Sequence, residues 1–276
     1  MFGVLFATAG TFFGEISSSI GKFEVQAKKE SIFTMGFLNS FWSLIFFGVL
    51  IYLRGSFVFS LASLPTFTVR AILEILQLHI TLLAIVNAER TAYNFIRTIT
   101  IPLLLLVDII LGYNIAIHQL LGIVSIFVGI LILFKNHGIE RNGLGFVLFT
   151  SINAVATISL YKYNISHFNS VEGEQFVLLI ILLLYLAFGA KFFAKENPIK
   201  FFKKPIFFIQ SFSDGLGATF LSFAYLFAPA SIILSAKRSL SIAWSLFSGK
   251  IYFHEQHIAI KIVSTSFLIL GIILLI

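Results

Sequence analysis

The chain has 276 residues, of which 58% are hydrophobic and 11% are charged, and its mean hydropathy is +1.00. Soluble domains carry about 25% charged residues, so this composition predicts an integral membrane protein without a separate soluble domain. The absence of cysteine excludes disulfides, thiolate metal sites and cysteine nucleophiles. The net charge of +7 does not indicate a nucleic-acid partner, because the cations flank apolar segments, where Lys and Arg set topology.

Ten apolar segments follow one another along the chain, each bounded by charges, proline or polar clusters. They are predicted at 2–21, 32–53, 67–87, 91–112, 117–134, 143–163, 174–193, 206–227, 229–253 and 258–275. A helix of about 20 apolar residues crosses roughly 30 Å of hydrocarbon. We therefore expect an all-α integral membrane protein with ten transmembrane helices, named spans one to ten below. Pro102 should kink span four.

The two halves of the chain are similar to each other. The matching segments are 3–8 with 145–150, 97–102 with 238–243, and 129–133 with 271–275. The shifts are 142, 141 and 142 residues, which predicts a five-helix repeat at 1–135 and a second at 136–276. Because five is odd, the second repeat is inserted upside down. Inverted repeats place solute sites near the midplane at the repeat interface and support alternating access.

The loop charges predict the orientation of the chain. Twelve Lys and Arg residues follow odd-numbered spans. They are Lys22, Lys28, Lys29, Arg90, Lys135, Arg141, Lys191, Lys195, Lys200, Lys203, Lys204 and Lys250. Only Arg54 and Lys162 follow even-numbered spans. Because cytoplasmic loops carry the excess of Lys and Arg, the sequence predicts a cytoplasmic (inner) membrane protein with both termini on the non-cytoplasmic side.

Three cations lie inside predicted spans at a depth where charge is costly. Lys237 and Arg238 lie in span nine, and Arg97 lies at the position in span four that the repeat aligns with Arg238. Acids on neighbouring helices could neutralise these cations, or the cations could bind an anionic solute in one shared cavity. Asn94 lies on the same helix face as Arg97, and Ser241 on that of Arg238. Both are candidate hydrogen-bonding groups for a solute, although serine in membrane helices also serves packing.

The candidate acids are Glu15, Glu74 and Asp214. Glu15 either neutralises Arg97 or Lys237 or acts as a protonatable coupling group. Asp214 is a candidate partner of the two span-nine cations. Glu74 lies four residues after Arg70, at the spacing of an ion pair on one helix face.

Two further features concern helix packing. Lys261, near a predicted helix end, is expected to extend its ammonium group toward the interface. Gly10 and Gly14 form a GxxxG pattern, which permits close helix packing.

Catalytic motifs are absent from the sequence. There is no GxSxG, phosphate-binding loop or HExxH, and embedded segments contain no metal-ligand pair at helical spacing. We therefore expect a protein that is not an enzyme and that holds no cofactor or metal.

The chain resembles the drug/metabolite transporter superfamily, in the manner of its EamA-like ten-helix members. Lys237-Arg238 followed by Gly249-Lys250-Ile251 is similar to span nine of the nucleotide-sugar and triose-phosphate branch, and Arg97 before Pro102 is similar to its span four. This resemblance implies that Arg97, Lys237 and Arg238 bind substrate phosphate. The chain departs from the family in its loop charge, since family members usually keep both termini in the cytoplasm.

Three functional hypotheses follow from the sequence. The first is a secondary transporter that moves a small organic anion, phosphorylated or carboxylated, by alternating access. The second is a proton-coupled exporter of amino acids or other small metabolites, with Glu15 or Glu74 as the coupling group. The third is a non-transporting membrane protein with a filled interior. The expected partners are a small solute and the lipid bilayer, without nucleic acid; a homodimer is left open.

Overall fold

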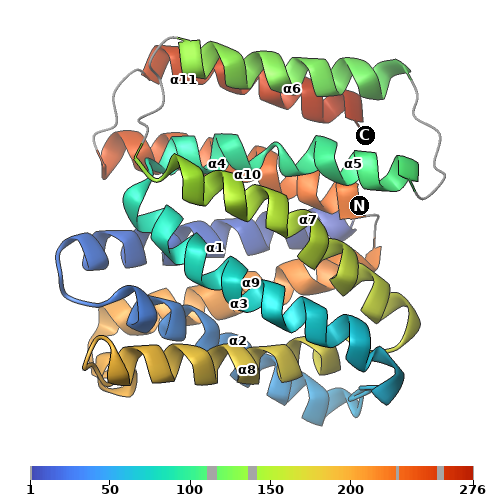
Figure 1. The fold of residues 1–276 in the computed structure, drawn as a ribbon. Helices are drawn as coiled ribbons and strands as arrows, with labels where there is room; N and C mark the ends of the chain where they lie inside the picture. Colours follow the sequence, from blue (N-terminus) through green and yellow to red (C-terminus); the bar gives the residue numbers. More distant parts are fainter. Residues whose placement is uncertain (1, 111–116, 136–141, 228–229, 254–257, 276) are drawn as a thin grey trace.

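The computed structural model describes residues 2–110, 117–135, 142–227, 230–253 and 258–275, and these residues contain helices but no strand (Figure 1). The α-helices are α1 (Phe2–Gln26), α2 (Ile32–Arg54), α3 (Leu64–Asn87), α4 (Arg90–Arg97), α5 (Thr100–Ile110), α6 (Ile117–Lys135), α7 (Leu144–His167), α8 (Val171–Phe192), α9 (Pro205–Phe227), α10 (Ala230–Ile251) and α11 (Ile258–Leu275). Two short 3-10 helices, η1 (Leu61–Ser63) and η2 (Pro198–Lys203), precede α3 and α9. The expectation of an all-α chain is confirmed for the described residues.

The predicted span four is interrupted, so that α4 ends at Arg97 and α5 begins at Thr100. Between them the backbone N–H of Thr98 donates to Phe95 O at 3.0 Å, three residues back instead of the four of an α-helix. Pro102 lies one turn further on and has no N–H to donate to the Thr98 carbonyl. The kink expected from this proline is therefore present as a break in the helix.

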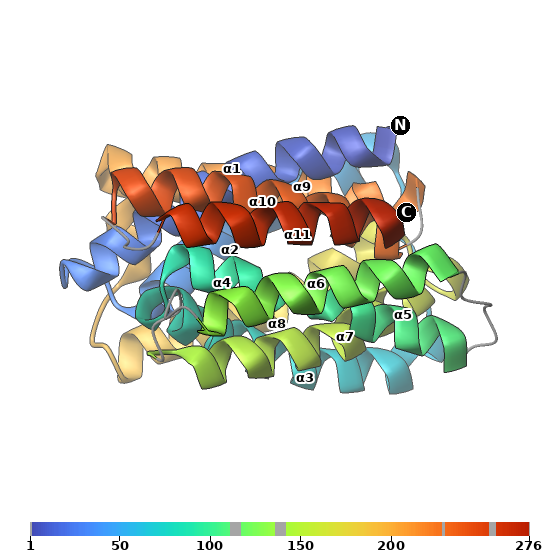
Figure 2. The same ribbon diagram turned by 90° about the horizontal axis from the view of Figure 1, so that it is seen from above.

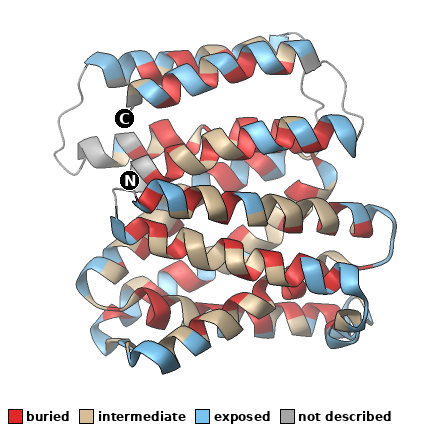
Figure 3. Ribbon diagram, turned by 180° about the vertical axis from the view of Figure 1, so that it is seen from behind, coloured by how far each residue is buried: buried red, intermediate tan, exposed pale blue. Residues whose placement is uncertain are grey.

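Several helices have the length and composition of membrane spans. Four are long and apolar enough to cross a bilayer: Ile32–Arg54, Leu61–Asn87, Leu144–His167 and Val171–Phe192. Two shorter apolar helices are Leu120–Ile132 and Ala259–Leu274. Large apolar side chains such as Ile72, Leu121 and Leu184 are more than half exposed, and exposed residues follow the outer faces of the helices (Figure 3). Large apolar side chains exposed along helices of this length and composition indicate contact with lipid, so the fold is that of a membrane protein.

Contacts between the first and second halves of the chain build the interior. Helix α1 packs on α9, and α3 packs on α7. Gly10 and Gly217 allow the first contact, because a Cβ on either one would lie 2.8 Å from the other's carbonyl oxygen. The close packing expected of the Gly10–Gly14 pattern is confirmed at Gly10. In the second contact, Gln77 Nε2 donates to Thr150 O at 3.1 Å.

Helices α6 and α11 pack on each other at one edge of the bundle, and Figures 1 and 2 show them side by side from two directions. A Cβ on Gly129 would lie 3.0 Å from Ser264 O, and one on Gly271 would lie 2.7 Å from Gly122 O. Helix α2 packs on α8 and α9, whereas α10 packs on α1 and α4. The interior is thus formed by helices from both halves of the chain.

Three cations that were assigned to loops contact groups inside the helix bundle instead. Lys22 in α1 is 4% exposed, and its Nζ donates to Ala88 O at 2.5 Å. Arg90 is 1% exposed at the start of α4, and Lys162 in α7 donates to Tyr225 O at 2.7 Å. Carbonyl and carboxylate partners stabilise these groups, so their positions do not report on orientation. Without them, ten cations remain on the odd side against Arg54 on the even side, and the predicted orientation stays a prediction.

Lys261 does not reach the interface, and the expectation that it would do so is wrong. Its side chain is fully buried, and Nζ lies 3.3 Å from Glu89 Oε2. A carboxylate from the residue before α4 therefore holds the ammonium group of α11 inside the bundle.

Candidate functional site

A polar cavity of about 300 Å³ lies among α1, α4, α9 and α10, with contributions from α2 and α3. Seven of the eight candidate site residues line it: Arg97, Lys237, Arg238, Asn94, Ser241, Glu15 and Asp214. The eighth, Glu74, is not part of the lining. The fold thus brings together residues from both halves of the chain that are more than 200 positions apart in sequence.

In the described part of the chain no carboxylate lies within ion-pair distance of the three candidate cations, although Asp214 and Glu74 are near enough to attract Lys237 electrostatically. No ion pair of 4.0 Å or less involves Arg97, Lys237 or Arg238. Arg238 is only 2% exposed, and its Nε has no hydrogen-bond partner. Arg97 donates to the Tyr93 hydroxyl and lies 5.1 Å from the centre of the same ring. In this conformation the cations therefore keep donors available to an anion in the cavity.

The neutral polar residues of the site connect the helices that carry the cations. Asn94 Nδ2 donates to Ser241 O at 3.4 Å, which joins α4 to α10. Ser245 donates to the Ile242 carbonyl of its own helix at 3.0 Å, as packing serines do. Asn94 therefore positions α4 against α10, at the level of Arg97 and Arg238.

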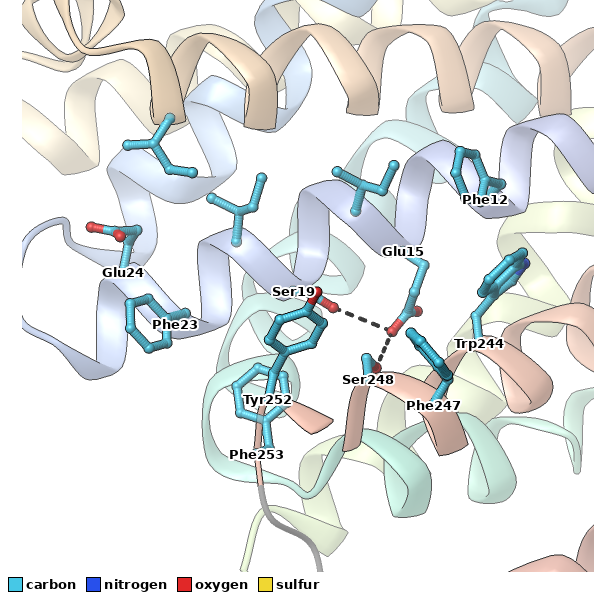
Figure 4. A pocket seen from close by; sticks show the side chains of 13 residues that line it. Phe12, Glu15, Ser19, Phe23, Glu24, Trp244, Phe247, Ser248, Tyr252 and Phe253 are labelled. Carbon is cyan, nitrogen blue, oxygen red and sulfur yellow. Dashed lines mark hydrogen bonds between the residues drawn. The ribbon is translucent and has the colours of Figure 1, made fainter. Parts of the chain in front are cut away.

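Glu15 is paired with a cation that the sequence had assigned to a loop. Its Oε2 lies 2.7 Å from Arg90 Nη2, and its Oε1 accepts from Ser248 Oγ at 2.9 Å (Figure 4). Neither Arg97 nor Lys237, the partners considered from sequence, forms an ion pair with it. Asp214 lines the same cavity but also forms no ion pair within 4.0 Å.

Arg90 is the main site residue that the sequence reasoning missed. It lies directly between two apolar segments, where a cation is usually a topology signal. Its spacing was the available clue, because Arg90, Asn94 and Arg97 recur at intervals of four and three residues and share one face of a helix.

A second buried cluster of charges lies outside the cavity, where α3, α7 and α8 meet. Arg70 Nη1 lies 2.6 Å from Glu174 Oε1, with the two side chains 2% and 0% exposed. Glu74 lies 3.8 Å from Arg70, which confirms the predicted pair at this spacing. Asn164 and Asn169 also donate to the Glu174 carboxylate. Glu174 was not recognised from sequence because it begins a predicted span, where a charge ordinarily marks the boundary.

The described residues contain no group of three or more His, Cys, Asp or Glu side chains placed to hold a metal ion. No protein-family model matches this chain, and no curated protein matches it. The geometry of the cavity is therefore the basis for assigning a function.

Proposed function

We propose that this protein is a secondary transporter that moves a small organic anion across a membrane by alternating access. The observation that carries the proposal is the cavity with Arg97, Lys237 and Arg238 on its wall and no carboxylate within ion-pair distance of them. Buried charge in a membrane is costly unless it is paired. A phosphate or carboxylate on the solute removes that cost, and the planar guanidinium groups can bind its oxygens in a bidentate manner.

The packing of the helices supports ten spans arranged as two inverted five-helix repeats. Gly129 lies against Ser264 of α11, and Gly271 lies against Gly122 of α6. A shift of 142 residues relates Gly129 to Gly271 and Gly122 to Ser264, so the two contacts are copies of each other. The contact of α1 with α9 has its counterpart in that of α7 with α3. Inverted repeats are the architecture on which alternating access is built in many secondary transporters.

The break between α4 and α5 supports the same proposal. Transporter sites near the bilayer midplane are typically formed by discontinuous helices. Here the break directly follows Arg97, which lines the cavity. The resemblance of this segment and of Lys237-Arg238 to the nucleotide-sugar and triose-phosphate branch favours a phosphorylated solute. Our proposal includes insertion in a cytoplasmic membrane with both termini non-cytoplasmic.

Exchange is the transport mode that suits this site. An empty cavity leaves three cations without an ion pair and only partly balanced by the more distant Asp214, so moving it across the membrane unloaded is unfavourable. A loaded site is close to neutral. We therefore expect obligatory exchange of one anion for another, with slow movement of the empty carrier.

Counterflow in proteoliposomes tests the proposal, with vesicles preloaded from a panel of phosphorylated and carboxylated metabolites. Each charge-assisted hydrogen bond contributes about 1.5–3 kcal/mol, so Arg97→Ala and Lys237→Ala should lower uptake roughly tenfold or more. Lys200→Ala, which removes a cation from η2 outside the cavity, is the matched control and should leave uptake unchanged. Equal uptake by all three variants would contradict the anion site.

The other two hypotheses are less well supported by the geometry. Glu15 is held by Arg90 at 2.7 Å, and Glu74 does not line the cavity, so neither coupling candidate is free in the site. A filled interior, expected of a non-transporting protein, does not agree with a cavity of about 300 Å³. Uptake that depends steeply on a proton gradient and shows no preference for anions would instead favour the exporter.

A further inference from the structure

A second pocket, of about 540 Å³, lies between α1 and α10. Most of its wall is apolar, and its side chains include Phe12, Ile16, Ile20, Phe23, Trp244 and Phe247. Figure 4 shows the labelled aromatic side chains of α1 and α10 facing each other across this space. The pocket has the volume and the lining of a site for a hydrocarbon chain.

Glu15 separates this apolar pocket from the polar cavity and is the residue common to both linings. Its carboxylate is held on one side by Arg90 at 2.7 Å and on the other by Ser248 at 2.9 Å. The two spaces, one with three cations on its wall and one lined mostly by apolar side chains, therefore meet at Glu15.

We infer that the solute is an amphiphilic anion, with a phosphate-bearing head in the polar cavity and a hydrocarbon chain in the pocket between α1 and α10. This inference rests on the proposed anion transport and specifies its substrate class. The chemistry of the two spaces matches the two ends of such a molecule: cations for the head, apolar side chains for the tail.

Tryptophan fluorescence can test the inference, because the chain has two tryptophans and only Trp244 lines the pocket. Trp42 packs against Phe46, Phe208 and Phe212, so Trp42→Phe leaves Trp244 as the single reporter. The protein is reconstituted in phosphatidylcholine vesicles that contain an alkyl phosphate with a brominated chain. A choline-headed amphiphile with the same brominated chain is the control probe, since bromine quenches fluorescence only on contact.

The phosphate-headed probe should quench Trp244 at a membrane fraction about tenfold lower than the choline-headed probe, as expected for one or more charge-assisted contacts to the head. Arg97→Gln should remove this preference. Ile20→Phe, which fills the pocket, should reduce quenching by the phosphate probe, whereas Ile72→Phe on the exposed face of α3 should not. The Trp244→Phe protein, which retains Trp42, should show no head-group preference.

Equal quenching by the two probes would mean that ordinary bilayer lipid fills the pocket, and the inference would be overturned. A thermal-shift titration with inorganic phosphate and butyl phosphate separates this failure from that of the proposed function. If these soluble phosphates stabilise the protein while the probes quench equally, the anion site stands and the hydrocarbon site does not. If neither soluble phosphate nor the brominated phosphate binds, both proposals are wrong.

Discussion

Two arginines of this protein, Arg70 and Arg238, are equally hidden from solvent but differ in their partners. Arg70 lies 2.6 Å from Glu174, in a cluster completed by asparagine side chains. Arg238 is as deeply buried but has no acidic partner within 4.0 Å in the described chain. Burial alone therefore does not distinguish a structural cation from a binding one. The difference is whether the protein itself supplies the counter-charge.

The largest effect on stability is expected at the buried ion pair between Arg70 and Glu174. Removing one partner of a buried ion pair costs about 3–5 kcal/mol, because the other charge is left uncompensated. Glu174→Ala should lower the free energy of unfolding by roughly this amount, measured by denaturant unfolding in detergent. The control is Glu172→Ala two residues earlier, whose partner Arg54 is 55% exposed and whose loss should cost at most about 1 kcal/mol. Equal losses would show that the Arg70–Glu174 pair has no special role.

Two glycines of α1 should separate packing from cavity volume. Gly10→Val places a side chain against the backbone of α9, where a Cβ already lies 2.8 Å from Gly217 O, and should destabilise by about 1–3 kcal/mol. Gly10 and Gly14 both line the cavity, but a Cβ on Gly14 would meet no atom within 4 Å. Gly14→Val should therefore fold normally and slow transport by occupying the site. Gly145 also has no atom within 4 Å of a Cβ but lies outside the cavity, so Gly145→Val should change neither stability nor transport. If Gly145→Val slowed transport as much as Gly14→Val, cavity volume would not be the cause.

At the unsatisfied cations the expected stability change is near zero or favourable. Lys237→Met removes the charge of a half-buried side chain that has no acidic partner within 4.0 Å, so the unliganded protein should melt at the same or a higher temperature. The thermal shift produced by a bound anion should disappear, because a ligand stabilises only in proportion to its affinity for the folded state. A marked loss of stability without ligand would show that Lys237 is a structural residue like Arg70.

A further effect, seen only when the pH is changed, concerns an acid outside the spans. Burial raises the pKa of Glu30, between α1 and α2, to about 8, and the nearby Glu24 and Glu196 carboxylates add to the rise, whereas Gln210 opposes it. The ordinary value is 4.5, so the folded protein retains a proton that the unfolded chain loses between these two pH values. Stability contributed by Glu30 is thus complete below about pH 4.5 and lost as pH rises to about 8.

Glu30→Gln should flatten this part of the stability profile, measured as unfolding free energy against pH. Glu24→Gln is the comparison, since it keeps Glu30 and removes only one of its neighbours. If the Glu30→Gln profile falls between pH 4.5 and 8 as steeply as that of the parent, the titrating group is a different one.

Much of the local structure could be predicted because hydrophobicity is a property of contiguous sequence. The described helices coincide with the predicted segments to within a few residues, and the break after Arg97 follows from a proline that lacks an N–H. The errors concern charged residues. Lys22, Arg90 and Lys261 lie where a cation normally marks a loop or a helix end, but each is buried against an oxygen from a distant part of the chain. Sequence spacing within one helix does not reveal such partners.

The sequence by itself determined an all-helical membrane protein, the internal similarity of its halves, and cations too deep in apolar segments to be topology signals. Only the tertiary structure decided which cations have partners. In the folded protein Arg70 pairs with Glu174, and Arg90 pairs with Glu15. Arg97, Lys237 and Arg238 line one cavity, and no carboxylate lies within ion-pair range of them. The physical reason is that hydrophobic burial depends on the composition of each segment, whereas an ion pair depends on two side chains meeting within a few ångströms. Whether two such side chains come together depends on how helices distant in sequence pack on each other.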